Sequence, residues 1–424
     1  MIKKFTEDFN NIFIDMECPS RIGIALSGGA DSMALLMLLK YWVDCERSCV
    51  KIFAVTVDHS LRENSHHEAY EISEFCTKNN ISHQILKWEH GEITSGTQEK
   101  ARNARYTLLS TWAKDNEINV ILTAHHLGDQ IEQILISLSK GAGIYSYHIK
   151  KFSTIKNILF VRPLLEYSKD DLRKYLVLNH IPWWEDPSNK DKKYLRNKLR
   201  NIAEVFLEIS DKKRVTTSIS NIQRASAALN DLSDMFINVH VNISNLGYAK
   251  FNIKSYYSQS DEVRFSVLRK LILQIGAQKQ DIRINSIITV DNAIKLAKSK
   301  TLGGCEILFI DDLCIIIREF GRNFPQTVIM EKTIVWDNRF IASSTYANHM
   351  INYINKYELH EILKIDPSFL DFDKNLPKKI KIKILLTLPS IRRLEKLVAI
   401  PHISYYSDLT LNRKNIITNI NIPN

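Results

Sequence analysis

The feature of this chain that most constrains its fold is a short polar loop between two apolar runs. The loop, Ser27-Gly28-Gly29-Ala30-Asp31-Ser32, follows apolar residues 22–26 and leads into apolar residues 33–39. This order predicts a buried strand, a tight turn and the start of a helix. Two glycines allow a close approach of the backbone to a ligand, and N–H groups at a helix start favour an anion. The loop therefore predicts a phosphate site, with Asp31 as a candidate ligand of a bound Mg²⁺.

The loop differs from two better-known phosphate-binding sequences. It lacks the Lys of the GxxxxGK[ST] pattern, and it lacks the GxGxxG spacing of dinucleotide-binding folds. The SGGxDS pattern instead resembles the pyrophosphate loop of the N-type ATP pyrophosphatases, which cleave ATP to AMP and pyrophosphate. For so short a motif, the alternative is an ordinary turn that is rich in small residues.

Length and charge limit the remaining possibilities. The 424 residues suffice for two or three domains, and the net charge of +10 suggests a polyanionic partner such as RNA or DNA. Basic residues concentrate in 374–424, which contains ten Lys or Arg against two acidic residues. The six cysteines form no CxxC pair, and no run of eighteen apolar residues is present. We therefore expect a cytoplasmic protein without a membrane span, with reduced thiols and a C-terminal module that contacts nucleic acid.

Strand and helix patterns alternate through the first half of the chain. The predicted strands are 22–26, 52–57, 83–88, 120–123 and 158–161. The predicted helices are 32–41, 65–78, 97–115, 128–138 and 168–179. Such alternation predicts an α/β fold, a doubly wound and mostly parallel sheet whose ligands bind at the C-terminal ends of the strands.

The pattern changes after about residue 200. Residues 219–238 and 261–275 predict amphipathic helices, and Asp311-Asp312 predicts a hairpin turn between two apolar runs. The predicted domains are a catalytic domain at 1–208, a helical domain at 209–322, a linker at 323–350 and a small, basic, mixed α/β domain at 351–424.

Polar side chains follow the second predicted strand, at the edge where a ligand would bind. Asp58, His59 and Arg62 could contact a nucleotide there, or they could belong to a solvated loop. Arg102 and Arg105 are three residues apart, so they share one face of a predicted helix. Two guanidinium groups on one face suit a triphosphate or an RNA phosphate, although surface arginines are the plainer interpretation.

A second polar group follows the fourth predicted strand. Asp129 and Glu132 share a helix face, and they could bind Mg²⁺ together with Asp31 or neutralise an ammonium group. The adjacent His125 and His126 point to opposite sides of an extended segment, which argues against a shared metal. We expect one histidine to contact a nucleotide and the other to be structural.

Seven segments, in this order, resemble the tRNA(Ile)-lysidine synthases. They are SGGADS, VDHSLR, ARNARY, TAHHLGDQIEQ, RPLL, EDPSN and RNKLR, and they lie within residues 27–200. Residues 301–318 and 388–402 look like the second and third domains of that family. SGGxDS alone is typical of the whole superfamily, whereas the set of seven is much more specific.

The resemblance implies an ATP-dependent ligase that forms a carbon–nitrogen bond. Its substrates would be ATP, L-lysine and an isoleucine tRNA with a CAU anticodon. The 2-keto oxygen of the wobble cytosine would attack the α-phosphate of ATP and release pyrophosphate. The ε-amine of lysine would then attack the adenylated carbon and release AMP, which leaves lysidine in the tRNA.

The resemblance also implies roles for individual residues. Catalysis is assigned to Asp31, Asp129, Glu132, Arg102, Arg105 and Arg196. ATP binding is assigned to the loop residues Ser27, Gly28, Gly29, Ala30, Asp31 and Ser32, with Asp58, His59 and His125. Mg²⁺ would be held by Asp31, Asp129 and Glu132. RNA contacts are assigned to Arg62, Arg200, Arg392 and Arg393.

Three positions depart from the family pattern. The family usually reads HHxDDxxET, but this chain has Gly128 for the first Asp and Gln133 for the Thr, and Ser146 stands where a Gly is usual. A tRNA-thiolating ATP pyrophosphatase is an alternative function, disfavoured by the lack of a CxxC pair. A catalytically inactive tRNA-binding protein is another, favoured by Gly128 alone. The sequence leaves a homodimer open.

Overall fold

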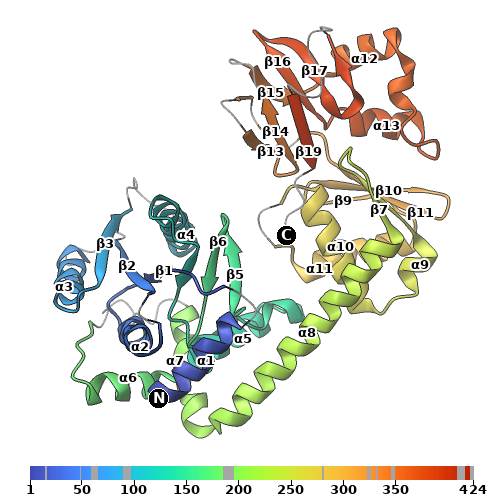
Figure 1. The fold of residues 1–424 in the computed structure, drawn as a ribbon. Coiled ribbons are helices and arrows are strands. Elements are labelled where there is room, and N and C mark those ends of the chain that lie inside the picture. The colour runs from blue at the N-terminus through green and yellow to red at the C-terminus, as the bar shows by residue number, and fades with distance from the viewer. Residues whose placement is uncertain are drawn as a thin grey trace. The chain divides into compact units, whose positions relative to one another are not determined.

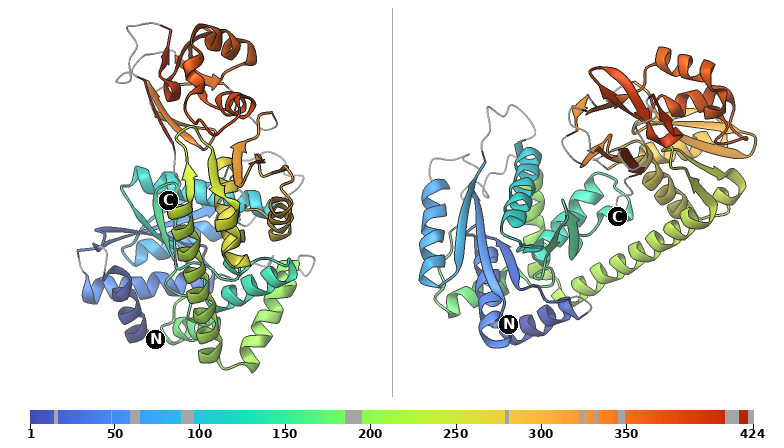
Figure 2. Two further views of the ribbon diagram at one scale, coloured as in Figure 1. Left: turned by 90° about the vertical axis from the view of Figure 1, so that its right-hand side faces the viewer. Right: turned by 45° about the horizontal axis from the view of Figure 1, so that its top comes forward.

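The computed structural model describes residues 1–14, 17–47, 49–58, 65–88, 97–184, 195–278, 281–321, 325, 327–330, 333–344, 349–407 and 416–420. The chain divides into two compact units, Met1–Arg224 and Ala225–Asn424 (Figure 1). Helix α8 (Lys212–His240) contains the boundary and runs without interruption (Figure 2). Within the described ranges, no helix combines the length and the apolar character needed to cross a membrane.

The first unit is built on a six-stranded sheet with the order β3-β2-β1-β4-β6-β5. Its strands are β1 (Arg21–Ala25), β2 (Lys51–Asp58), β3 (Ser82–Lys87), β4 (Val120–Leu122), β5 (Phe152–Ile155) and β6 (Ile158–Val161). The pairings are parallel, except that the edge strand β5 runs antiparallel to β6. The predicted mostly parallel sheet is confirmed, and β5 is the strand that the sequence analysis missed.

Helices cover both faces of this sheet (Figure 1). They are α1 (Ile2–Asn10), α2 (Ala30–Glu46), α3 (Ser65–Lys78), α4 (Thr97–Asp115), α5 (Leu127–Ser139), α6 (Lys169–Leu178) and α7 (Leu195–Ile209). Leu122 of β4 belongs to a core with α1, α2 and α6, whereas its neighbour Ile121 packs in a separate core with α4. Because successive strand residues face opposite sides, both faces of the sheet are buried, as a parallel sheet requires.

The second unit contains three smaller sheets. The first has the order β7-β8-β11-β10-β9, with β7 (Val241–Ile243), β8 (Ala249–Asn252), β9 (Lys300–Leu302), β10 (Cys305–Ile310) and β11 (Leu313–Arg318). The second has the order β12-β15-β16-β17-β18, with β12 (Val328–Ile329), β15 (His349–Tyr353), β16 (Pro389–Arg393), β17 (Lys396–Ile400) and β18 (Tyr405–Tyr406). The third has the order β13-β14-β19, with β13 (Thr333–Trp336), β14 (Phe340–Ser344) and β19 (Ile416–Ile420). The helices are α9 (Ile253–Tyr257), α10 (Asp261–Ile275), α11 (Ile284–Lys295), α12 (Lys356–Ile365) and α13 (Lys378–Leu385).

Two expectations for the second half need correction. Residues 209–322 are not only helical, because α8 to α11 accompany the five-stranded sheet of β7 to β11. Residues 323–350, expected as a linker, contain β12, β13, β14 and the start of β15. The side chains of Trp336 and Phe340 in this segment are buried in a core, so the described part of the segment packs as part of the second unit. The predicted hairpin between β10 and β11 is confirmed.

Candidate ATP-binding site

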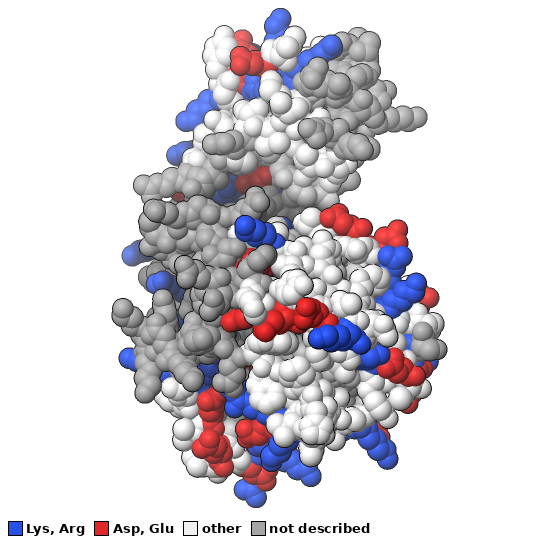
Figure 3. All heavy atoms as spheres, turned by 90° about the vertical axis from the view of Figure 1, so that its left-hand side faces the viewer, with Lys and Arg blue, Asp and Glu red and all other residues white. Residues whose placement is uncertain are grey.

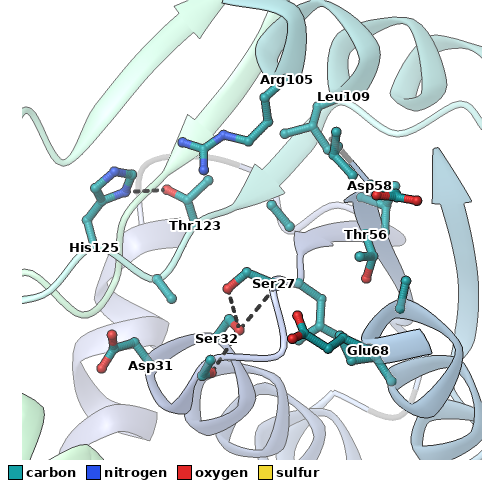
Figure 4. A pocket seen from close by; sticks show the side chains of 18 of the residues that line it. Ser27, Asp31, Ser32, Thr56, Asp58, Glu68, Arg105, Leu109, Thr123 and His125 are labelled. Carbon is teal, nitrogen blue, oxygen red and sulfur yellow. Dashed lines mark hydrogen bonds between the residues drawn. The ribbon is translucent and has the colours of Figure 1, made fainter. Parts of the chain in front are cut away.

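A pocket of about 620 Å³ lies at the C-terminal edge of the parallel sheet in the first unit. Ser27, Asp58 and Thr123, which come at the ends of β1, β2 and β4, are among its lining residues (Figure 4). The chain passes from β1 to β2 on one side and returns from β3 to β4 on the other side of β1. The pocket therefore lies at the switch point where ligands bind in open α/β sheets.

The glycine loop forms one wall of this pocket. Gly28 has a φ of +77°, and a Cβ there would lie 2.6 Å from Cδ1 of Ile72, so both the backbone and the space require glycine. The Ser32 hydroxyl donates to the carbonyl of Gly29 (2.9 Å) and accepts from the N–H of Ser27 (3.2 Å). Gly29 is the N-cap of α2, so the unpaired N–H groups of the first turn lie beside the loop. This arrangement provides a site for an anion.

Two cationic side chains line the same pocket, Arg105 from α4 and Arg200 from α7. In Figure 4 the guanidinium of Arg105 extends from α4 toward Thr123. Arg102 is exposed instead, with its guanidinium 5.2 Å from the centre of the Tyr106 ring, and it is not among the described lining residues. The pair of arginines predicted on one helix face is thus divided, and Arg105 is the one that reaches the pocket.

Four described carboxylates line the pocket, and two of them, Asp31 in the first turn of α2 and Asp129 in the first turn of α5, lie beside the same histidine, His126. Burial raises the pKa of Asp31, and the charge of Asp129 acts in the same direction against the influence of His126. Burial also acts to raise the pKa of Asp129, but interactions with His126 and His125 outweigh it and lower the pKa. Asp129 is therefore the carboxylate that is more strongly held in its charged form.

The two carboxylates fit a Mg²⁺ ion bound to ATP. Oδ1 of Asp31 is buried and has no hydrogen-bond partner among the described residues. Magnesium is commonly held by one or two carboxylates together with substrate phosphates and water. The predicted third ligand is placed differently: Glu132 lies one turn further along α5, is 3% exposed, and is not among the described lining residues. The described residues contain no group of three His, Cys, Asp or Glu side chains that could hold a metal.

The two adjacent histidines have different surroundings, and the prediction that one of them contacts a nucleotide stays a prediction. His125 lines the pocket, and its Nδ1 lies 3.1 Å from the hydroxyl of Thr123. Burial, with the nearby charges of Arg162, Arg105 and Arg102, lowers the pKa of His125 to about 3, so the ring is neutral near pH 7. His126 is instead the N-cap of α5, where its side chain accepts a hydrogen bond from the N–H of Gly128.

Other predicted site residues are not among the described residues that line the pocket. His59, Arg62 and the side chain of Arg196 are outside the described residues. In the second unit, Arg392 donates two hydrogen bonds to Glu358 (2.8 and 2.6 Å), whereas Arg393 is exposed.

Sequence reasoning missed two polar residues that line the pocket, Thr56 and Glu68. The Thr56 hydroxyl lies 2.8 Å from Nε2 of His83, and Glu68 is in the first turn of α3. Thr56 could have been found as the inward polar residue near the end of a predicted strand. Nothing in the spacing of Glu68 distinguishes it from the other acidic residues of its helix.

The fold and the pocket define a PP-loop ATP-binding protein, and the PP-loop domain family matches residues 1–206. The tRNA(Ile)-lysidine synthase of Orientia tsutsugamushi (strain Boryong) is 34% identical over 406 residues, which cover 92% of this chain and 91% of that protein. The enzyme of the same name from Rickettsia akari (strain Hartford) is 33% identical over 433 residues, with 96% and 95% covered. The chain belongs to the tRNA(Ile)-lysidine synthase family.

This membership confirms the predicted family and the predicted enzyme class, an ATP-dependent ligase of tRNA modification. Among solved structures, a U34-tRNA thiolase from Methanococcus maripaludis with its [4Fe-4S] cluster is similar with a TM-score of 0.46. It is 14% identical and covers 53% of this chain and 78% of its own, which is too distant to bear on function.

Proposed function

We propose that this chain joins L-lysine to C2 of the wobble cytidine in tRNA(Ile) with a CAU anticodon, using ATP bound in the pocket of the first unit. The observation that carries the proposal is the meeting of the glycine loop, two carboxylates and Arg105 in one pocket of about 620 Å³. The relatives' name supplies the tRNA and the product.

In the first step, the 2-keto oxygen of cytosine attacks the α-phosphate of ATP and pyrophosphate leaves. The N–H groups at the start of α2 and the hydroxyls of Ser27 and Ser32 suit the phosphates, and Arg105 and Arg200 supply positive charge at the same pocket. Donors and cations that are already in place stabilise the negative charge that develops on the leaving group. Mg²⁺, held by Asp31 and Asp129, would neutralise part of the phosphate charge when bound.

In the second step, the ε-amine of lysine attacks C2 of the adenylated cytosine, and AMP leaves with the oxygen. Lysine arrives as an ammonium ion, so it must give up a proton before it attacks. Asp31 and Asp129 provide negative charge at the pocket for this cation, and a carboxylate or a water accepts the proton. Glu132 is buried one turn further along α5, so it would act on the substrate through the position of α5 and not by direct contact with the substrate.

The tRNA has a second set of candidate contacts in the second unit. Lys374, Lys378, Lys379 and Arg393 are exposed there and suit RNA phosphates. The two lysines at the start of α13 oppose the helix dipole, so they do not serve helix stability. Basic and acidic side chains are interspersed on the face shown in Figure 3, so the positive charge is not gathered there. Since the substrate is a tRNA, we also propose that the enzyme acts in the cytoplasm.

The test is incorporation of labelled L-lysine into a tRNA(Ile) transcript with a CAU anticodon, in the presence of ATP and Mg²⁺. We expect incorporation that requires ATP and disappears when the wobble C is replaced by U. Pyrophosphate release without lysine transfer would retain the ATP chemistry and overturn the choice of nucleophile. Binding of tRNA with neither signal would indicate the inactive homologue instead.

A further inference from the structure

A histidine that the proposed reaction does not use lies between the two pocket carboxylates. His126 is 4% exposed, and its Nε2 lies 3.5 Å from Oδ2 of Asp31 and 3.6 Å from Oδ2 of Asp129. Asp31 belongs to α2 and Asp129 to α5, so the imidazole ring is close to both of the helices that carry these groups. Without a donor between them, two carboxylates this near one atom would repel each other.

The start of α5 fixes the orientation of this ring. Nδ1 of His126 accepts a hydrogen bond from the N–H of Gly128 (3.0 Å), and the N–H of His126 donates to Oδ2 of Asp129 (2.9 Å). Because Nδ1 is an acceptor, the proton of the neutral ring is assigned to Nε2. The N–H that faces the two carboxylates is therefore a donor, held in place by the helix cap on the other side of the ring.

The hydrogen bonds around this donor are incomplete within the protein. The distances from Nε2 to the two carboxylates exceed the usual range of about 2.7–3.2 Å for a hydrogen bond. Nε2 of His126 and Oδ1 of Asp31 are both buried, and neither has a hydrogen-bond partner in the described part of the chain. Long contacts of this kind are common in enzymes without substrate and shorten when the substrate binds.

Gly128 leaves the space that the ring occupies. A Cβ at Gly128 would lie 2.7 Å from Cε1 and 3.0 Å from Nδ1 of His126, which is closer than side chains pack. This is the position where the chain departs from the HHxDDxxET pattern. In this chain, a side chain at residue 128 would therefore require the imidazole to shift from the place that it has here between the carboxylates.

We propose that His126 is a positioning residue, which holds Asp31 and Asp129 at a fixed separation in the pocket, and that in this chain Gly128 leaves the space in which its ring lies. The inference rests on the proposed function, since it concerns the carboxylates that would serve Mg²⁺ and lysine. It gives Gly128 a role in an active enzyme, in contrast to the inactive homologue that this residue alone would suggest.

The first test is His126→Asn in the full chain. Asparagine is a good N-cap, so the start of α5 is preserved, but it has no group that reaches both carboxylates. We expect kcat for lysidine formation to fall by about 10- to 100-fold, the size typical of misplaced catalytic groups, with the KM for tRNA unchanged. Thermal unfolding reports whether the variant is folded. His180→Asn, a change at an exposed histidine outside the pocket, is the matched control.

The second test is Gly128→Ala, alone and together with His126→Asn. Alanine is the better helix former, so the melting temperature should stay the same or rise. We nevertheless expect kcat to fall by about tenfold, because the methyl group displaces the ring. In the His126→Asn background, Gly128→Ala should change kcat by less than about twofold, since both changes act through one ring.

Binding of a non-hydrolysable ATP analogue, with and without Mg²⁺, gives a readout that does not depend on lysidine formation. The gain in affinity that Mg²⁺ brings should shrink in His126→Asn and in Gly128→Ala, but not in His180→Asn. If the wild-type enzyme forms lysidine, and His126→Asn retains both kcat and the gain in affinity from Mg²⁺ within about twofold, the inference about His126 is overturned and the proposed function stands. If the losses of kcat in the two single variants multiplied in the double variant, the role of Gly128 would be overturned. A wild-type chain that forms no lysidine would overturn the proposed function, and the binding measurement would still decide the role of His126.

Discussion

Each unit contains a buried cluster of charged or polar side chains, and the two clusters are built differently. In the second unit, Asp337 accepts hydrogen bonds from Arg339 (2.7 Å) and from two nitrogens of Arg318 (3.2 and 3.1 Å). The arginines also donate to backbone carbonyls, Arg339 to Thr387 (2.7 Å) and Arg318 to Gly304 (3.1 Å). This cluster pairs its charges and joins the turn between β13 and β14 to β11 and to the segment between α13 and β16.

In the cluster of the first unit, by contrast, the described polar groups are incompletely hydrogen-bonded. Asp31, His126 and Asp129 are mostly buried, but Nε2 of His126 lies 3.5 and 3.6 Å from the two carboxylates, and Oδ1 of Asp31 has no partner among the described residues. Incomplete hydrogen bonding of buried groups costs stability unless something else completes it. The comparison indicates that the second cluster serves the fold of its own unit, whereas the first is arranged for a ligand. The predictions below separate these two roles.

The largest expected effect is on stability, from Asp337→Asn. Burial lowers the pKa of Arg339 to about 10 even with the opposing influence of Asp337, which shows how strongly this guanidinium depends on its counter-charge. Asparagine keeps the left-handed turn at residue 337, where φ is +50°, but it removes the negative charge that both buried arginines contact. We expect a loss of about 3 kcal/mol, or roughly 8 °C in the melting temperature of the second unit, by calorimetry.

The matched control for that change is Asp312→Asn. Asp312 pairs with Lys254 at 3.0 Å, but both side chains are largely exposed, so the pair contributes little. Its melting temperature should equal that of the wild type. Equal losses of melting temperature in Asp337→Asn and Asp312→Asn would show that the buried cluster stabilises the fold no more than an exposed ion pair does.

The second prediction is the reverse case, a large loss of activity with little loss of stability. Asp129→Asn keeps an oxygen that can accept from the N–H of His126, so the cap of α5 is retained. It removes a negative charge from the pocket, and we expect lysidine formation to fall by about 100-fold or more, equivalent to about 2.7 kcal/mol. A melting temperature that falls as far as in Asp337→Asn would mean that Asp129 also serves the fold.

The third prediction concerns Gly28 of the glycine loop, which can be compared with Gly141, a glycine outside the loop that also has a positive φ. Gly28→Ala places a methyl group 2.6 Å from Cδ1 of Ile72 and strains a backbone with a φ of +77°. We expect the KM for ATP to rise by about tenfold, because the loop must move from its place beside the phosphates. Gly141→Ala carries similar strain at a φ of +58° but meets no described atom within 4 Å, so it should leave the KM for ATP unchanged. A similar rise in both variants would assign the effect to general instability.

The first unit was largely predictable from the sequence, and the second only in part, in helix α10 and the hairpin of β10 and β11. Helices α3 and α4 cover the predicted residues 65–78 and 97–115, because long segments with a continuous periodicity give a strong signal. Strands β7, β8 and β12 have only three, four and two residues, which is too short for an alternating pattern to be recognised. Their positions depend on pairing with distant strands, and a local pattern does not contain that information.

The residues of the candidate site also differ in how far the sequence could predict their positions. The structure brings Asp31, Arg105, Asp129 and His125 to the pocket, and the sequence analysis named all four. Asp31, His125 and Asp129 lie in or next to a predicted βα turn, whereas Arg105 was named from its place on a helix face. A helical spacing of three residues predicts a shared face, but not how far along the helix a side chain can still reach a ligand. For that reason the sequence grouped Glu132 with Asp129. The place of the His126 ring depends on the side chain that Gly128 lacks, which becomes visible only in three dimensions.

The smallest expected effect distinguishes paired from exposed charges in the second unit. Arg392 is held by Glu358 at 2.8 and 2.6 Å, so Arg392→Ala should lower the melting temperature slightly and leave tRNA binding almost unchanged. The double change Lys378→Ala with Lys379→Ala removes two exposed charges, and it should weaken tRNA binding by a few-fold at low salt and reduce the salt dependence of the Kd. Filter binding at several salt concentrations measures both. If Arg392→Ala weakened binding more than the double lysine variant, RNA recognition would lie on β16 and not on α13. Arg392 would then contact the tRNA although it is paired with Glu358. On this surface, pairing with a carboxylate would therefore not distinguish a residue that stabilises the fold from one that binds a ligand.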